Sequence, residues 1–215
     1  GENVRQLYFG GFSGKVGDGM GEYIEISKDI DLEVHMTENL SEYNADSKNQ
    51  MDLVMFGFAV QHVSKIMRVL SMPGGNMLLV GVGGSGRQSL TRLASYVYQF
   101  NLKQISLSKS YGVVEWRDDM KDIIRDAGTA EQPVVFLFCD IQVKNSLFLE
   151  DINGMLNTGQ IPNLFQPDER ISIIDAVRAP AKAETGNELS NPELWEFFKG
   201  KVKEQLHIVL AFSPI

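Results

Sequence analysis

The stretch Gly81-Val82-Gly83-Gly84-Ser85-Gly86-Arg87-Gln88-Ser89 decides the fold of this chain. An apolar run, Met77 to Val80, leads into it, and a segment with helical character follows it. Strand, glycine loop and helix together hold a phosphate on backbone N–H groups at a helix N-terminus. Two positions depart from the usual phosphate loop: Arg87 stands in place of lysine, and Gln88 in place of serine or threonine. The sequence therefore predicts a nucleotide-binding loop with altered hydrolytic chemistry.

The glycines of this loop allow the backbone to curl until successive N–H groups converge on an anion. We expect the phosphate to be held by Gly81, Val82, Gly83, Gly84, Ser85 and Gly86. The pattern Gly81-x-Gly83-x-x-Gly86 also satisfies the dinucleotide fingerprint, but that fold needs an acid at the end of the second strand. Here the expected second strand ends Leu107-Ser108-Lys109, which favours the phosphate loop. A tight turn without a ligand is the remaining alternative.

The three residues after the last glycine carry the chemistry of the loop. Arg87 keeps the positive charge of lysine on a wider planar fork, which either clamps the outer phosphates or crowds the terminal one. Gln88 has no hydroxyl to offer to magnesium. Ser89 does, but it lies roughly 100° further around the helix and about 1.5 Å along it. Ser89 is therefore either a magnesium ligand or an ordinary helix serine.

A second motif is the apolar run Val134 to Phe138, which ends in Cys139-Asp140. Apolar strands that end in a pair of acids bind magnesium and activate water in ATPases of this kind. Only one acid is present here. Asp140 stands either at the metal position, with Ile141 replacing the catalytic acid, or at the base position, with Cys139 replacing the metal ligand. Loss of either group lowers hydrolysis far more than affinity.

Composition bounds the function. The chain has 215 residues, a net charge of −8 and 43% hydrophobic residues, which suits one substantial core. The acidic balance argues against nucleic acid or an anionic membrane as the main partner. One cysteine, Cys139, permits no internal disulfide and fits a reducing compartment. No apolar run approaches the roughly 20 residues that span a bilayer, and the three histidines show no metal spacing.

The order of elements predicts a three-layer α/β P-loop fold with a parallel sheet. Near-continuous apolar strands separated by helices are typical of a parallel sheet covered on both faces. We expect strands at 77–82, 105–107, 134–138 and 207–212, and helices at 51–70, 88–100, 113–126, 145–157, 168–183 and 191–205. Residues 10–21 contain six glycines and predict a loop. Because the chain ends at Ile215 directly after an apolar strand, we also expect it to be a piece of a larger protein.

Three stretches closely resemble the fourth AAA+ module of axonemal dynein heavy chains. They are Gly75 to Leu90, the run from Phe148 to Phe165, and Leu206 to Ile215. Weaker similarity lies upstream, at Leu7 to Gly10 and at Glu42-Tyr43-Asn44. The resemblance covers essentially the whole chain, and the Arg87-Gln88-Ser89 variant is part of the pattern for this module.

This resemblance implies a division of the chain into a leading segment, 1–50, and an AAA+ α/β core, 51–215. The helical lid, the fifth core strand and the microtubule-binding stalk would lie outside it. Aligned on the Phe148 to Phe165 stretch, the acidic pair falls on Cys139 and Asp140. The polar sensor at the end of the fourth core strand would be Ser213. Because leading segments of AAA+ modules pack on adenine, Tyr8 and Phe9 are weak candidates for that contact.

The resemblance also implies the function and the partners. We expect a regulatory module of a ciliary motor that binds ATP or ADP, with or without magnesium, and hydrolyses it weakly or not at all. An active ATPase module and a nucleotide-free structural module are the alternatives. The implied partners are the neighbouring AAA+ modules, the microtubule through the stalk, and dynein intermediate and light chains. The implied location is the cytoplasm, within the cytoskeleton of the cilium axoneme.

Overall fold

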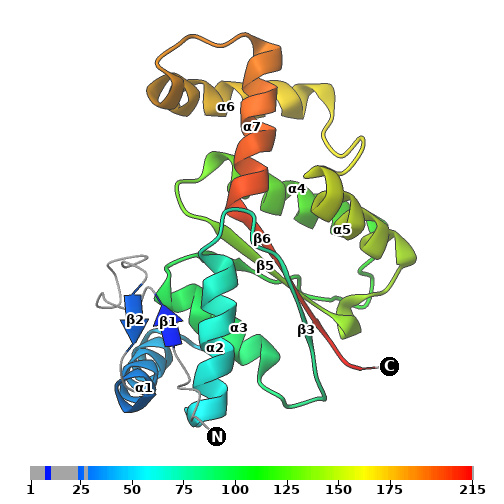
Figure 1. The fold of residues 1–215 in the computed structure, drawn as a ribbon. Coiled ribbons are helices and arrows are strands. Elements are labelled where there is room, and N and C mark those ends of the chain that lie inside the picture. The colour runs from blue at the N-terminus through cyan, green and yellow to red at the C-terminus, as the bar shows by residue number, and fades with distance from the viewer. Residues whose placement is uncertain (1–7, 11–23, 27–28, 215) are drawn as a thin grey trace, which may run out of the picture.

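A four-stranded parallel sheet forms the centre of the molecule (Figure 1). This computed structural model describes residues 8–10, 24–26 and 29–214, with side chains from Leu32 onward. The strands lie in the order β3 (Met77–Val80), β6 (Leu206–Phe212), β5 (Val134–Cys139) and β4 (Asn101–Lys103). A separate antiparallel pair joins β1 (Tyr8–Gly10) to β2 (Ile24–Ile26).

Helices cover both faces of this sheet. One face carries α1 (Asp29–Asp46), α2 (Gly57–Leu70) and α3 (Arg87–Val97). On the other side α4 (Val113–Thr129) and α5 (Ser146–Thr158) lie beside the sheet. Helix α6 (Pro167–Thr185) packs on α4 and on α7 (Asn191–Gln205), and α7 runs directly into β6 (Figure 1). The α/β fold with a parallel sheet between helical layers is therefore confirmed.

The position of strand β5 in the middle of the molecule explains why its sequence is continuously apolar. Its six residues are all buried, because β6 and β4 pair with it on either side and helices pack on both faces. Val135 and Leu137 belong to the core under α1 to α3. Phe136 and Phe138 belong to the core under α4 to α7, where the indole of Trp116 stacks on Phe148.

Two elements differ from the sequence-based expectation. The second strand is Asn101–Lys103 and not 105–107, because the backbone carbonyl of Ile105 accepts a hydrogen bond from the side chain of Gln142 at 2.7 Å instead of extending the sheet. The helix expected at 51–70 begins only at Gly57. The amide side chain of Asn44 bonds both the N–H and the carbonyl of Met51, at 2.7 and 2.9 Å, which holds that segment outside the helix.

Secondary structure in the first fifty residues was not predicted from the sequence. Helix α1 and strands β1 and β2 were not predicted. Of the loop expected at 10–21, Gly10 lies in β1 and residues 11–21 lie outside the described residues. The remaining predicted helices, and the strands near 77, 134 and 207, agree with the structure to within a few residues. No helix in the described ranges is long and apolar enough to cross a bilayer.

Candidate functional site

Three chain segments meet at the carboxyl edge of the sheet. In the parallel register Val80 lies opposite Phe212 and Cys139 lies opposite Ala211. The glycine loop after β3, Ser213 after β6 and Asp140 after β5 are therefore neighbours. Parallel α/β sheets bind their ligands outside this edge, so the fold brings together the two motifs that the sequence singled out.

The glycine loop has the backbone of an anion-binding turn. Gly84 and Gly86 have φ values of +77° and +78°, a left-handed conformation that costs side-chain-bearing residues roughly 1–2 kcal/mol. The N–H groups of Gly83, Gly84 and Gly86 make no hydrogen bond within the part of the chain that the structure describes. Helix α3 begins immediately afterwards and adds its own unpaired N–H groups. The loop thus offers several free donors in one turn, which fits a phosphate.

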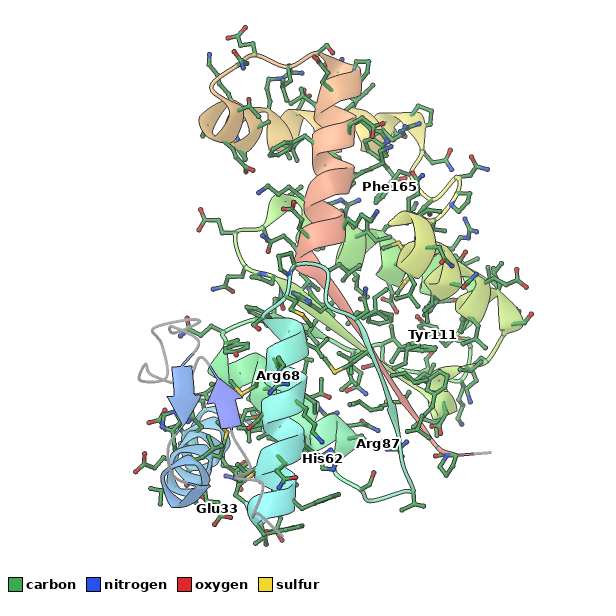
Figure 2. All side chains as sticks on the ribbon, in the orientation of Figure 1. Glu33, His62, Arg68, Arg87, Tyr111 and Phe165 are labelled. Carbon is green, nitrogen blue, oxygen red and sulfur yellow. The ribbon has the colours of Figure 1, made fainter. Side chains whose placement is uncertain are left out.

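Arg87, the first residue of α3, ties the loop to the neighbouring strand. Its guanidinium donates to the carbonyl oxygens of Phe212 and of Val82, the second at 3.3 Å. The N–H of Gly81 donates to the same Phe212 carbonyl at 3.2 Å. Figure 2 shows Arg87 beside the ends of β3 and β6. The expected contact of Arg87 with the outer phosphates stays a prediction. It requires the guanidinium group to bind phosphate in addition to these two carbonyl oxygens, or to release them.

Asp140 faces the end of β6. One carboxylate oxygen accepts the N–H of Ser213 and the other accepts the N–H of Ile141, both at 2.8 Å. Hydrogen bonding to the Ser213 side chain, followed by its backbone N–H, lowers the pKa of Asp140 below its ordinary value. Asp140 is therefore ionised at neutral pH and already accepts two backbone donors.

Comparison with known proteins assigns this chain to a protein family. The family model described as "P-loop containing dynein motor region D4" matches residues 51–215. The chain belongs to this family of dynein motor regions. It is 41% identical over 215 residues to human dynein axonemal heavy chain 3, covering 100% of this chain and 5% of that protein.

Two other relatives agree with this assignment. Human dynein axonemal heavy chain 1 is 46% identical over 178 residues, which is 83% of this chain and 4% of that protein. The dynein-1-beta heavy chain of the flagellar inner arm I1 complex of Chlamydomonas reinhardtii is 44% identical over 181 residues, which is 84% of this chain and 4% of that protein. This chain therefore spans about a twentieth of the heavy chains that it matches.

Sequence reasoning missed a polar cluster in the dynein motor region, next to the glycine loop. The side-chain oxygen of Gln88 accepts hydrogen bonds from Gln104 at 3.2 Å and from Arg92 at 3.4 Å. Arg92 also donates to Gln104 at 2.6 Å, and the Gln104 amide lies 3.7 Å from the Cys139 sulfur. The spacing of Gln88 and Arg92, one helical turn apart, is the only signal in the sequence for this cluster. Gln104 joins it only through the fold.

Cys139 and Gln88 beside the glycine loop are poor magnesium ligands, and the metal-binding role expected of Asp140 stays a prediction. Within the described ranges no group of three or more histidine, cysteine or acidic side chains could hold a metal ion. Burial raises the pKa of the Cys139 thiol, with the charge of Asp140 acting in the same direction. A neutral thiol and an engaged amide do not suit magnesium, which prefers free oxygen ligands. Ser89 makes no side-chain hydrogen bond in the described part of the chain, and its role as a ligand stays a prediction.

The segment before α2 borders the glycine loop of the dynein motor region. A Cβ atom on Gly86 would lie 4.0 Å from Leu53. Nearby, Val54 and Phe56 expose 74% and 57% of their surface. The predicted adenine contacts, Tyr8 and Phe9, lie in β1, but their side chains lie outside the described residues, so these two contacts stay predictions.

Proposed function

We propose that this chain is the nucleotide-binding large subdomain of the fourth AAA+ module of an axonemal dynein heavy chain. In this proposal it holds ATP or ADP on the glycine loop and hydrolyses it slowly or not at all. The observation that carries the proposal is the set of unpaired N–H groups on Gly83, Gly84 and Gly86 at the carboxyl edge of the sheet. A turn without a ligand would leave these donors to water alone.

The charges near the loop support binding of an anion. Arg87 and Arg92 both lie in α3, and within the described part of the chain neither pairs with a carboxylate. Two guanidinium groups beside free backbone donors favour the negative charge of a di- or triphosphate. The whole chain has a net charge of −8. The positive charge beside the loop is therefore a local feature of this site and not a reflection of the overall composition.

The single acid supports weak hydrolysis. A catalytic base must reach the attacking water, and Asp140 is the only acid at the two strand-end positions, 139 and 140. Both of its oxygens already accept backbone N–H groups of Ser213 and Ile141. Asp140 remains the candidate that positions water, and Ser213 the candidate sensor beside it. We place the adenine base against Leu53, Val54 and Phe56, because this segment borders Gly86.

The wider role follows from the similarity to axonemal heavy chains. We propose that the parent protein is part of a ciliary axoneme and moves on microtubules through a stalk outside this chain. Its partners would be the neighbouring modules of the ring and dynein intermediate and light chains. A site that binds without turning over can still regulate such a ring, because a nucleotide stabilises whichever state binds it more tightly.

A titration with a matched pair of glycine variants tests the proposal. Calorimetric titration of the chain with ADP and ATP is expected to show saturable binding, with phosphate release no faster than background. Gly84→Ala should weaken binding at least tenfold, since it strains the loop that holds the phosphate. Gly186→Ala is the control, because Gly186 has a similar φ of +71° and equally open surroundings at the end of α6.

Each alternative has its own outcome. No binding, either by the chain or by a complete module that includes the lid, would support a purely structural module. Turnover that Asp140→Asn abolishes would show an active ATPase instead. Equal loss of affinity in Gly84→Ala and Gly186→Ala would mean that the site is not at the glycine loop.

A further inference from the structure

The polar cluster beside the glycine loop carries positive charge where a phosphate-bound metal is usually held. Its members are Gln88 and Arg92 from α3, Gln104 from the segment after β4, and Cys139 at the end of β5. Gln88 occupies the loop position that supplies a hydroxyl to magnesium in standard phosphate loops. In this structure its oxygen accepts from Arg92 and Gln104. The loop position that holds a magnesium ligand in other proteins is therefore hydrogen-bonded to a guanidinium group here.

Arg92 is fixed in this place by its neighbours. Its guanidinium donates to Gln104 at 2.6 Å and to Gln88 at 3.4 Å, and the side chain is half-buried. It has no carboxylate partner in the described part of the chain. Side chains on a helix point toward its N-terminus, which for α3 is the glycine loop. A fixed and unneutralised positive charge therefore lies one helical turn from the phosphate donors.

The same cluster is unsuited to a divalent cation. A cation placed between Gln88 and Cys139 would meet the guanidinium of Arg92 within hydrogen-bonding distance of its ligands. It would also find a neutral thiol and no free carboxylate. Guanidinium, by contrast, is always protonated and recognises phosphate through charge-assisted hydrogen bonds. The positive charge that magnesium brings to other phosphate loops is already built into this one.

We infer that Arg92, held by Gln88 and Gln104, replaces the divalent cation, so that this site binds ADP independently of magnesium. The inference rests on the proposed function and sharpens it: the ligand is the metal-free nucleoside diphosphate. It also accounts for the joint presence of glutamine at 88 and cysteine at 139. A hydroxyl and a carboxylate at these two positions would bind a metal ion in the place that the guanidinium group occupies.

The test is a calorimetric titration of the chain with ADP in excess magnesium and in excess EDTA. The dissociation constants are expected to agree within about threefold. A dissociation constant at least tenfold weaker in EDTA would overturn the inference while leaving the proposed function intact. No binding in either buffer, by the chain and by a complete module that includes the lid, would remove the proposed function and this inference with it.

Arg92→Met is expected to weaken ADP binding in EDTA roughly tenfold, the effect of losing one charged hydrogen-bonding group. Arg68→Met, which removes one charge from an exposed position of α2, is the matched control and should have no effect. Arg92→Lys keeps the charge on a smaller group and should recover part of the affinity. Equal affinities of Arg92→Met and Arg68→Met would overturn the inference. Far-ultraviolet circular dichroism and thermal melting check that each variant is folded.

A restoration variant gives a readout that a purely structural role of Arg92 would not produce. Gln88→Ser combined with Cys139→Asp and Arg92→Met supplies a hydroxyl and a carboxylate and removes the guanidinium. ADP binding by this variant should become at least tenfold tighter in magnesium than in EDTA. If the ratio stays near one while binding persists, Arg92 does not occupy the place of a cation.

Discussion

The carboxylate of Asp140 accepts the backbone N–H of Ser213 across 2.8 Å and so joins the ends of strands β5 and β6. A second bond, from the N–H of Ile141, holds the other carboxylate oxygen. The only acid at the strand-end motif thus has a structural role that does not depend on any ligand. This role makes its effect on stability measurable separately from nucleotide binding.

Asp140→Asn is expected to lower the urea midpoint of unfolding at neutral pH, because an amide presents only one acceptor oxygen to these two donors. The bonds to Ser213 lower the pKa of Asp140 in the folded state. The stabilisation is therefore complete above the unfolded pKa, about 3.9, and is lost as the pH falls through the folded value. Urea unfolding at several pH values should show the gap to the wild type narrowing only below about pH 4. A gap that stays constant down to pH 2 would contradict this assignment.

Two glycines in packed helices should respond in opposite directions to alanine. In α4 a Cβ on Gly128 would overlap the ring of Phe198 in α7, so Gly128→Ala should cost about 1–3 kcal/mol of unfolding free energy through overpacking. In α7 nothing lies within 4 Å of a Cβ on Gly200. Gly200→Ala should therefore stabilise by about 0.5–1 kcal/mol. Denaturant unfolding measures both, and a stable Gly128→Ala variant would mean that α4 and α7 pack less closely.

The sequence predicted the parts of the fold that depend on local pattern. The run Val134 to Cys139 is apolar because both faces of β5 are covered, and the glycines near Gly84 mark a turn that only they adopt easily. Both features are visible without the fold. The strand-end neighbours Gly81 and Asp140 could also be placed together, since parallel strands end at one edge.

Features that depend on distant side chains were not predictable. Asn44 holds the backbone of Met51, seven positions away, through two hydrogen bonds, and α2 begins only after this segment. The carbonyl of Ile105 is engaged by Gln142, 37 positions away, and this shifted the second strand. Gln104 reaches Gln88 and Cys139 in the same way. Such contacts leave no periodic pattern in the chain, so the chemistry beside the loop emerged only from the structure.

The carboxylate of Asp151 should contribute to the stability of the fold, because it accepts a buried hydrogen bond. The indole N–H of Trp116 donates to its carboxylate at 2.9 Å, and the Trp116 side chain is fully buried. Asp151→Ala leaves that N–H without an acceptor and should cost about 1–3 kcal/mol of unfolding free energy. If this bond is the cause, the double variant with Trp116→Phe should lose clearly less than the sum of the single losses. Additive losses would assign the effect of Asp151 to other contacts, such as Arg117.

His207 should make the stability of the fold fall in mildly acidic solution. Its ring stacks on Phe100 with 5.5 Å between centroids, and Nδ1 lies 2.9 Å from the carbonyl oxygen of Gly75. Burial lowers the pKa of His207, although the hydrogen bond with Gly75 acts the other way. Below the unfolded pKa of about 6.5 the unfolded chain therefore binds a proton that the folded chain does not. The free energy of unfolding should fall as the pH drops from 7.5 toward 5.5, and less steeply in His207→Gln. Equal slopes in the two proteins, measured by urea unfolding, would mean that His207 takes up its proton without unfolding.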